Sequence, residues 1–353
     1  MWFDRLAGLV VREFKYAMSL VCVFFLSVSG SFAKADQSVN ALCSMQVDWC
    51  NAIKSEFEKQ SGIKVNLSLK SSGEALAQLA AERANPKFDL WIGGTGDPHL
   101  QAAEQDLTLS YQSQHLVQLH DWARKQAEQS SYRTVGLYAG ALGFGYNAEL
   151  VKKNKTPIPA CWKDLLKPEY KGEIQMSNPN SSGTAYVAIA TLVQIMGEDE
   201  AFKYLVALHK NINQYARSGA GPVKAVARGE SLIGVSFLHD AVGEAASGFP
   251  VKSVVPCEGT GYEIGSMSLI KGARNLTSAK KLYDWALLPV AQKLGSENKS
   301  FQVPSNKESP ISPLAPRFAD IKLIDYNFAK YGAAAERKRL ISRWDKEVSG
   351  AQK

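Results

Sequence analysis

The sequence predicts an α/β protein built from two doubly wound lobes that are joined by crossover strands. Segments that favour strands alternate with segments that favour helices along most of the chain. Near the N-terminus, residues 38–43, 49–62 and 63–69 have the pattern of a strand, a helix and a strand. Such alternation is typical of βαβ units around a parallel sheet. Ligands of these sheets bind beyond the carboxyl ends of the strands.

Two long extended segments predict how the lobes are connected. Residues 134–146 and 261–270 are apolar, contain several glycines and flank an inner α/β block at about 147–257. An α/β block between two such segments indicates a lobe inserted into another, with both segments crossing between the lobes.

This pattern divides the chain into four parts. We predict a signal peptide at residues 1–35, an N-terminal lobe at residues 36–138 and 267–305, an inserted C-terminal lobe at residues 139–266, and C-terminal helices at residues 306–353 that pack on the lobes.

The N-terminal segment has the features of an export signal. Arg5, Arg12 and Lys15 precede the apolar run AMSLVCVFFLSVSGSFA, and small residues follow at positions suited to signal peptidase. A membrane anchor is the alternative, but about 17 apolar or small residues are short for a span. We therefore expect a cleaved signal peptide and a periplasmic protein.

The charge of the chain favours a small anionic ligand. The 353 residues carry a net charge of +7 with a pI of about 9.0. Loss of residues 1–35 takes away four basic and two acidic residues and leaves +5. Basic residues are interspersed with acidic ones, so we expect no nucleic-acid partner.

The cysteines that remain after export predict disulfides. Cys43, Cys50, Cys161 and Cys257 are an even number in an oxidising compartment, which allows three connectivities. Cys43 and Cys50 are seven residues apart and form a natural local loop, so Cys161 would then pair with Cys257. A metal site is the alternative, but no Cys-x-x-Cys spacing supports it.

Small polar residues recur where predicted strands give way to helices. Each such junction exposes unpaired backbone N–H groups at a positive helix end, and hydroxyl groups and glycine there suit an anion such as phosphate. One junction alone is most often a helix cap, but five junctions in two blocks predict a polar cleft between the lobes. The residues are Ser44, Ser71, Ser72, Gly94, Thr95, Ser181, Ser182, Gly183, Thr184 and Ser218.

A second group of polar residues lies in the C-terminal part of the pattern. His239 and Asp240 follow a strand-like segment, and Glu263 lies on the second crossover segment. These side chains suit hydroxyl groups or a metal. The alternative is structural: His239 and Asp240 would cap a helix, and Glu263 would form an ion pair at the hinge.

The mature chain resembles the periplasmic solute-binding proteins of ABC importers, in the ferric-type branch that includes hexose-phosphate binders. The resemblance rests on LCSMQVDWC, SSGEALAQLAAE, NPKFDLWIGGTGDPHLQAA, ALGFGYN, PEYKGEIQMSNPNSSGTAY, SGAGPVKAVARGE, FLHDA and PCEGTGYEIGSMSLIKGARN. It implies a type II bilobal fold that closes on its ligand by hinge bending. It also implies delivery to an inner-membrane permease and no chemistry. We further expect a monomer that needs no metal and no cofactor.

The resemblance also assigns roles to residues. In the hexose-phosphate binders a His-Asp pair and a Glu hold sugar hydroxyls, and these match His239, Asp240 and Glu263. Hydroxyl-bearing loops hold the phosphate, which matches Ser71 and Ser72 on one side and Ser182 and Thr184 on the other. The predicted function is therefore capture of a phosphorylated small molecule, a hexose phosphate above all.

Three other functions stay open at this point. Ferric iron is one, although the adjacent tyrosine pair of iron-binding relatives is missing and only single tyrosines such as Tyr186 are found. An organophosphonate is the second, with Asp240 or Glu263 facing its amine. A secreted hydrolase is the third, with Ser182 as nucleophile and His239 as base, but no Gly-x-Ser-x-Gly elbow surrounds Ser182.

Overall fold

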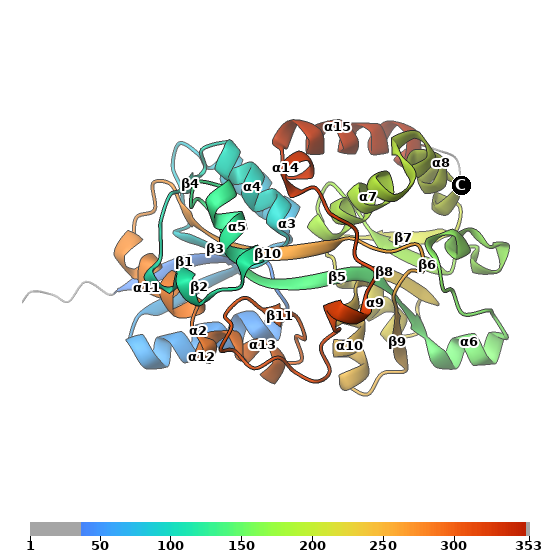
Figure 1. Ribbon diagram of the computed structural model, residues 1–353, viewed down its shortest axis with the longest axis horizontal. Coiled ribbons are helices and arrows are strands. Elements are labelled where there is room, and N and C mark those ends of the chain that lie inside the picture. Colours follow the sequence, from blue (N-terminus) through green and yellow to red (C-terminus); the bar gives the residue numbers. More distant parts are fainter. Residues whose placement is uncertain (1–36, 351–353) are drawn as a thin grey trace, which may run out of the picture. The chain divides into compact units, whose positions relative to one another are not determined.

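One mixed sheet extends through both lobes of the computed structural model, which describes residues 37–350 (Figure 1). The strand order is β2-β1-β3-β10-β5-β8-β6-β7, with β4 and β11 beside the N-terminal half and β9 beside the C-terminal half. The strands are β1 (Ser38–Cys43), β2 (Lys64–Leu69), β3 (Leu90–Ile92), β4 (Thr108–Leu109), β5 (Val135–Asn147), β6 (Ile174–Ser177), β7 (Ile212–Ala216), β8 (Ile233–Phe237), β9 (Val251–Val254), β10 (Tyr262–Ile270) and β11 (Val303–Pro304).

Each lobe contains three strands that run parallel to one another, as the alternating pattern predicts. β1 pairs in parallel with β2 and β3 in the N-terminal lobe, and β6 pairs in parallel with β7 and β8 in the C-terminal lobe. Helices cover both faces of each part; in Figure 1, α3 and α4 lie above the N-terminal strands and α2 and α12 lie below them. The helices are α2 (Val47–Ser61), α3 (Ser72–Ala81), α4 (Gly96–Glu104), α5 (Asp121–Gln129), α6 (Ala148–Asn154), α7 (Gly183–Met196), α8 (Glu198–His209), α9 (Gly221–Ala227), α10 (Leu238–Ala246), α11 (Leu276–Ala286), α12 (Pro289–Gln292), α13 (Leu294–Glu297), α14 (Phe328–Tyr331) and α15 (Ala334–Trp344).

Two antiparallel strands, β5 and β10, connect the lobes. β5 pairs with β10 from Val135 to Ala141 and with β8 from Leu142 to Tyr146, so one strand belongs to both halves of the sheet. The predicted α/β class, with two lobes joined by crossover strands, is confirmed. The predicted lobe boundaries fall inside these two strands and stay a prediction.

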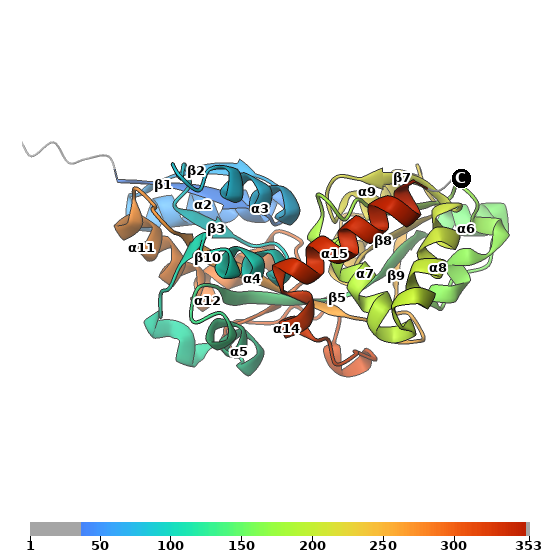
Figure 2. The same cartoon turned by 90° about the horizontal axis from the view of Figure 1, so that it is seen from above.

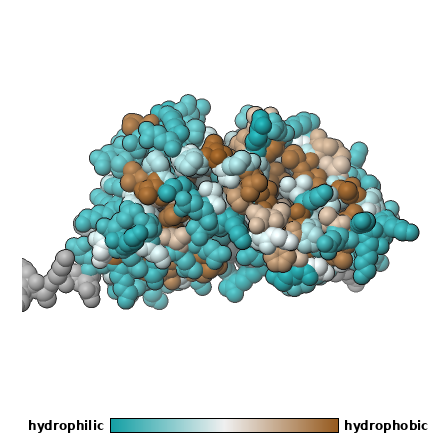
Figure 3. Space-filling model, turned by 90° about the horizontal axis from the view of Figure 1, so that it is seen from below, coloured by the Kyte–Doolittle hydropathy of each residue, from teal (hydrophilic) through white to brown (hydrophobic). Residues whose placement is uncertain are grey.

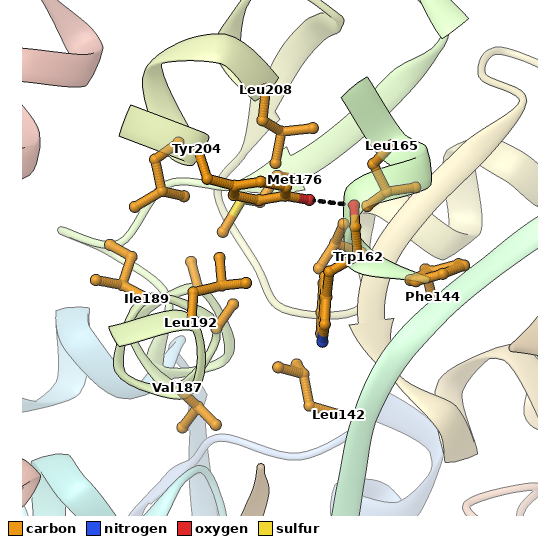
Figure 4. Packing of buried hydrophobic residues seen from close by; sticks show 14 of the residues in the cluster. Leu142, Phe144, Trp162, Leu165, Met176, Val187, Ile189, Leu192, Tyr204 and Leu208 are labelled. Carbon is orange, nitrogen blue, oxygen red and sulfur yellow. Dashed lines mark hydrogen bonds between the residues drawn. The ribbon is translucent and has the colours of Figure 1, made fainter. Parts of the chain in front are cut away.

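Each lobe has its own hydrophobic core, and the core of the C-terminal lobe contains a buried tryptophan at its centre (Figure 4). Trp162 is almost fully buried, and its indole Nε1 donates to the Gly259 carbonyl oxygen at 3.1 Å. Tyr204 donates to the Trp162 carbonyl oxygen at 2.6 Å. Both polar atoms are satisfied, so the core tolerates them at little cost.

The α-helix α15 lies across the seam between the lobes (Figure 2). Arg339 and Arg343 of α15 form ion pairs with Glu198 at the start of α8, at 2.6 and 2.8 Å. At the other end of α15, the Ala334 N–H donates to Glu104 of α4 at 2.7 Å. The helix therefore contacts both lobes on the side away from the strands that join them.

Both predicted disulfides are confirmed. Cys43 pairs with Cys50 at the start of α2, and Cys161 pairs with Cys257 in the C-terminal lobe. The predicted signal peptide lies outside the described residues.

Hydrophilic residues cover most of the face shown in Figure 3, and hydrophobic residues appear there in separate patches. The exposed large apolar side chains of the described chain include Val117, Ile158 and Phe249. Isolated apolar side chains are common on folded proteins and mark no site by themselves. No helix within residues 37–350 has the length and apolar character needed to span a membrane.

The two disulfides differ in the length of chain that they close, which generates a prediction. The loops span 7 and 96 residues. In the chain-entropy model, opening the longer loop costs about 5 kcal/mol of unfolding free energy and opening the shorter about 2 kcal/mol. Urea unfolding of the Cys161→Ala/Cys257→Ala and Cys43→Ala/Cys50→Ala variants measures both losses. Equal losses, or a larger loss for the short loop, would contradict the expectation.

Candidate functional site

The polar strand ends of both lobes meet at one cleft of about 530 Å³, a volume typical of small-molecule sites. Its walls come from the loops after β1, β2 and β3 in the N-terminal lobe. On the other side they come from the N-terminal ends of α7, α9 and α10, and both crossover strands contribute to the floor. This is the location that parallel sheets favour for ligands.

The N-terminal wall is built around the first turn of α3. The Ser71 N–H donates to Glu74 at 3.2 Å, so Glu74 closes the first turn of the helix. The next hydroxyl, Ser72, accepts a hydrogen bond from the Thr95 N–H at 3.1 Å, which ties this turn to the loop after β3. The hydroxyl of Thr95 itself is buried and has no partner among the described residues.

The loop after β3 requires two glycines. Gly93 and Gly94 have φ angles of +75° and +88°, and a side chain on Gly94 would lie 2.4 Å from the Ser72 hydroxyl oxygen. The Gly94 N–H donates to the Tyr138 hydroxyl at 2.9 Å. Gly94 therefore shapes the wall, and its N–H group already has a partner within the protein.

The C-terminal wall is built around the first turn of α7. Ser182 caps the helix by accepting from the Ala185 N–H at 3.4 Å. Gly183 and Thr184 follow as the first helical residues, whose N–H groups have no acceptor within a helix. A Cβ on Gly183 would lie 1.8 Å from Thr95 Oγ1 of the opposite lobe, and one on Gly219 would lie 2.1 Å from Thr184 Oγ1. Only glycine allows such close approach.

The walls also contain three cations that the sequence analysis did not single out: Lys70, Lys224 and Arg217. Arg217 forms an ion pair with Glu74 across the cleft. Partial burial alone would raise the pKa of Glu74, but hydrogen bonds from Arg217 and Ser71 outweigh it and lower this pKa. The Arg217 side chain is 77% exposed, so solvent screens the pair and its contribution to stability is small.

His239, Asp240 and Glu263 form one buried cluster at the floor of the cleft. His239 Nε2 lies 3.8 Å from an Asp240 oxygen and 3.9 Å from a Glu263 oxygen. Asp240 accepts from Ser236 of β8 at 2.6 Å and from Gln46 of the other lobe at 2.8 Å. Gly140 of β5 makes room for the imidazole, because a Cβ there would lie 2.5 Å from His239 Nδ1.

Burial sets the protonation of this cluster. Desolvation and the nearby charge of Asp240 raise the pKa of Glu263 well above its ordinary value. Burial lowers the pKa of His239, and Asp240 offsets only part of that effect. The raised pKa of Glu263 favours its protonated form, which can donate a hydrogen bond, and the lowered pKa of His239 favours the neutral imidazole.

The two lobes contact each other at the rim of the cleft. The Ser71 hydroxyl and the Gly73 N–H of α3 both donate to the Ser181 carbonyl oxygen, at 2.6 and 3.0 Å. The Ser181 hydroxyl donates to the Arg217 carbonyl oxygen at 2.8 Å. Ser181 is thus a contact between the lobes, and it is the one predicted site residue that the structure does not place in the lining of the cleft.

The other predicted residues all line the cleft, together with several that the sequence analysis missed. A local signal existed for Lys70 and Arg217, since each directly precedes a predicted serine, and for Gln46, which lies in the quoted motif LCSMQVDWC. Tyr138 and Gln302 carry no such signal, because tertiary structure alone brings them to the cleft. The missed residues that line it include Met45, Gln46, Lys70, Glu74, Tyr138, Arg217, Lys224 and Gln302.

The cleft has few donors of the kind that iron prefers. Tyr138 is the one tyrosine in its lining, and burial raises the pKa of this phenol well above its ordinary value. Within residues 37–350, one group of possible metal ligands lies close together: Cys161, Cys257 and Glu258. The two cysteine sulfur atoms of this group are joined in a disulfide.

Comparison with known proteins gives one matching family. The model of a family described as bacterial extracellular solute-binding proteins matches residues 85–331. An uncharacterised protein of Haemophilus influenzae is 44% identical over 329 residues, which are 93% of this chain and 95% of that protein.

Two further similarities are to proteins whose names include a ligand. The structure of the periplasmic binding protein AfuA from Actinobacillus pleuropneumoniae, with exogenous fructose-6-phosphate bound, is 43% identical. It has a TM-score of 0.87, and the match covers 90% of this chain and all of that one. A putative 2-aminoethylphosphonate-binding periplasmic protein of Salmonella paratyphi A is 28% identical, over 79% of this chain and 82% of that protein.

The raised pKa of Glu263 generates a prediction about stability. A group whose folded pKa lies above its unfolded value, here near 4.5, stabilises the fold fully below that pH. This contribution is lost as the pH rises through the folded pKa. We therefore expect the unfolding free energy of the Glu263→Gln variant, relative to the unsubstituted protein, to increase from pH 4.5 upward. Chemical denaturation at several pH values tests this, and parallel stability curves would show that Glu263 is not destabilised by burial.

Proposed function

The chain belongs to the bacterial extracellular solute-binding proteins, the binding components of ABC importers, and from this premise we propose that its solute is a hexose phosphate. The protein would capture this ligand in the cleft between its lobes in the periplasm and deliver it to a permease of the inner membrane. The single observation that carries the proposal is the combination, in one cleft, of an anion-binding wall and a cluster suited to hydroxyl groups.

The anion-binding wall supports the phosphate half of the ligand. The first turns of α3 and α7 line the cleft from opposite lobes, and each helix N-terminus attracts negative charge. The hydroxyls of Ser72, Thr95 and Thr184 lie beside them as further donors. Lys70 and Lys224 add positive charge at the same cleft, which favours a dianion and increases its rate of encounter.

The buried cluster supports the sugar half. A hydroxyl group both donates and accepts, and the cluster suits both functions: Asp240 offers acceptor oxygens, and the raised pKa of Glu263 favours a protonated carboxyl that can donate. The three residues are almost fully buried, so hydrogen bonds to a ligand would form in a region of low dielectric constant. The similarity to AfuA, whose structure holds fructose-6-phosphate, supports the same assignment.

We also propose that the protein acts as a monomer whose lobes close on the ligand by rotation about β5 and β10. β5 pairs in both halves of the sheet, and the other contacts between the lobes are polar groups of α3, α7 and the loop after β1, the exposed Arg217–Glu74 ion pair, and α15, whose first residue reaches Glu104 of α4. Such contacts form and break at small cost, as hinge closure requires.

An organophosphonate is the second candidate, favoured by the similarity to the putative 2-aminoethylphosphonate-binding protein. Asp240 would then face an ammonium group. Ferric iron is less well supported, because the lining of the cleft offers a single tyrosine with a raised pKa.

The arrangement of the described residues gives no support to a hydrolase. Ser182 caps α7 through its hydroxyl oxygen, and no hydrogen bond joins it to His239 within residues 37–350. The family and the similar proteins are binding proteins.

Binding measurements test the proposal directly. We expect fructose 6-phosphate or glucose 6-phosphate to raise the unfolding free energy of the purified protein by roughly 2.7 kcal/mol at 100 times the dissociation constant. Free hexose, inorganic phosphate, 2-aminoethylphosphonate and ferric citrate form the comparison panel. The largest shift with 2-aminoethylphosphonate or iron, or no shift with any hexose phosphate, would refute the proposed ligand.

A further inference from the structure

Two glutamine side chains form a polar group beside the buried cluster, and neither belongs to the predicted site. Gln46 lies in the loop closed by the Cys43–Cys50 disulfide and precedes α2. Gln302 directly precedes β11, which pairs with β5 at Ala139, next to the glycine that makes room for His239. Both glutamines line the cleft.

Hydrogen bonding fixes how the two amides are oriented. Gln46 donates through its nitrogen Nε2 to a carboxyl oxygen of Asp240 at 2.8 Å. The Gln46 oxygen must then face the other way, where it accepts from Gln302 Nε2 at 3.2 Å and from Ser300 at 3.3 Å. These hydrogen bonds run in one direction, from Gln302 through Gln46 to Asp240. This direction fixes which end of each amide is the nitrogen and which is the oxygen.

The amide oxygen of Gln302, where this series of hydrogen bonds begins, is an acceptor without a donor. The Gln302 oxygen, Oε1, is buried and has no hydrogen-bond partner among residues 37–350. The residue is only 8% exposed, so bulk water does not solvate it freely. A buried amide oxygen that lacks a donor costs free energy, and such groups are rare in folded proteins unless water or a ligand satisfies them.

We propose that Gln302 and Gln46 form an amide subsite that recognises one hydroxyl group of the bound sugar. The Gln302 oxygen accepts from that hydroxyl, and the second N–H of Gln46 is available to donate to it or to a neighbouring oxygen. The inference rests on the proposed function, and it deepens that function by naming residues that select among phosphorylated ligands.

The subsite specifies the chemistry of the ligand group that it accepts. Gln302 Oε1 requires a donor, so a hydroxyl fits, whereas a carbonyl, an ether or an ionised phosphate oxygen does not. It also links recognition to closure, because Gln46 comes from the N-terminal lobe and Asp240 from the C-terminal lobe. Gln46 positions an Asp240 oxygen only when the lobes are together.

The test compares how the protein and a Gln302→Met variant discriminate among hexose phosphates that each lack one hydroxyl. Methionine keeps the length of the side chain and removes its acceptor. We expect the unsubstituted protein to lose roughly 10- to 100-fold in affinity for one deoxy analogue, since a buried polar group is then left unpaired. The Gln302→Met variant should bind the parent hexose phosphate more weakly by the same factor. It should bind the parent and this deoxy analogue with equal affinity.

Two further variants keep the result interpretable. Gln46→Met should weaken binding of every hexose phosphate, because it also releases Asp240. Gln129→Met, on the exposed surface of α5, makes the same substitution outside the cleft and should leave all affinities unchanged. Unfolding midpoints show whether each variant is folded.

The outcomes separate the two proposals. If the unsubstituted protein binds hexose phosphates but Gln302→Met keeps its affinity and its full preference for every hydroxyl, the amide subsite is refuted and the proposed function stands. If the unsubstituted protein binds no hexose phosphate, both proposals fail.

Discussion

The structure depends on two helix N-termini that face one cleft from opposite lobes. The ends of α3 and α7 carry positive partial charge and N–H groups without intrahelical acceptors, so bringing them together is unfavourable unless polar groups or an anion lie between them. The protein itself supplies one acceptor: the Ser181 carbonyl oxygen accepts from the Ser71 hydroxyl and from the Gly73 N–H at the start of α3. The rest of the cleft remains suited to a negatively charged ligand.

The shared strands β5 and β10 make this arrangement possible and reversible. Because β5 pairs with β10 in one half of the sheet and with β8 in the other, each lobe has its own core, which is compatible with the proposed change of the angle between the lobes. The same strands carry Gly140 and Glu263 to the floor of the cleft, next to His239. The proposed ligand contacts and the proposed hinge therefore involve the same few residues, and a ligand that bridges the lobes would stabilise the closed form by its differential affinity.

The fold class and most residues of the candidate site could be predicted from the sequence, because they follow from patterns between residues that are close together in the chain. Alternating strand and helix patterns predict the α/β class, and the small polar residues from Ser181 to Thr184 indicate the start of a helix. What escaped prediction is tertiary: Tyr138 and Gln302 reach the cleft only because β5 and β11 pair there. Ser181 has the same composition signal as Ser182, but its side chain turns to the Arg217 carbonyl. Small polar residues between a predicted strand and a predicted helix indicate an anion site, but they do not show which of the hydroxyl groups points into the cleft.

The most direct test of the account is whether the cleft must close for the ligand to bind. The Gly183→Ala variant places a methyl group 1.8 Å from the position of Thr95 Oγ1, between the lobes, at a helical position that alanine favours. Calorimetric titration with fructose 6-phosphate should show a loss of at least about tenfold in affinity, with an unchanged unfolding midpoint. Full affinity in this variant would mean that the ligand is not held between the two helix ends.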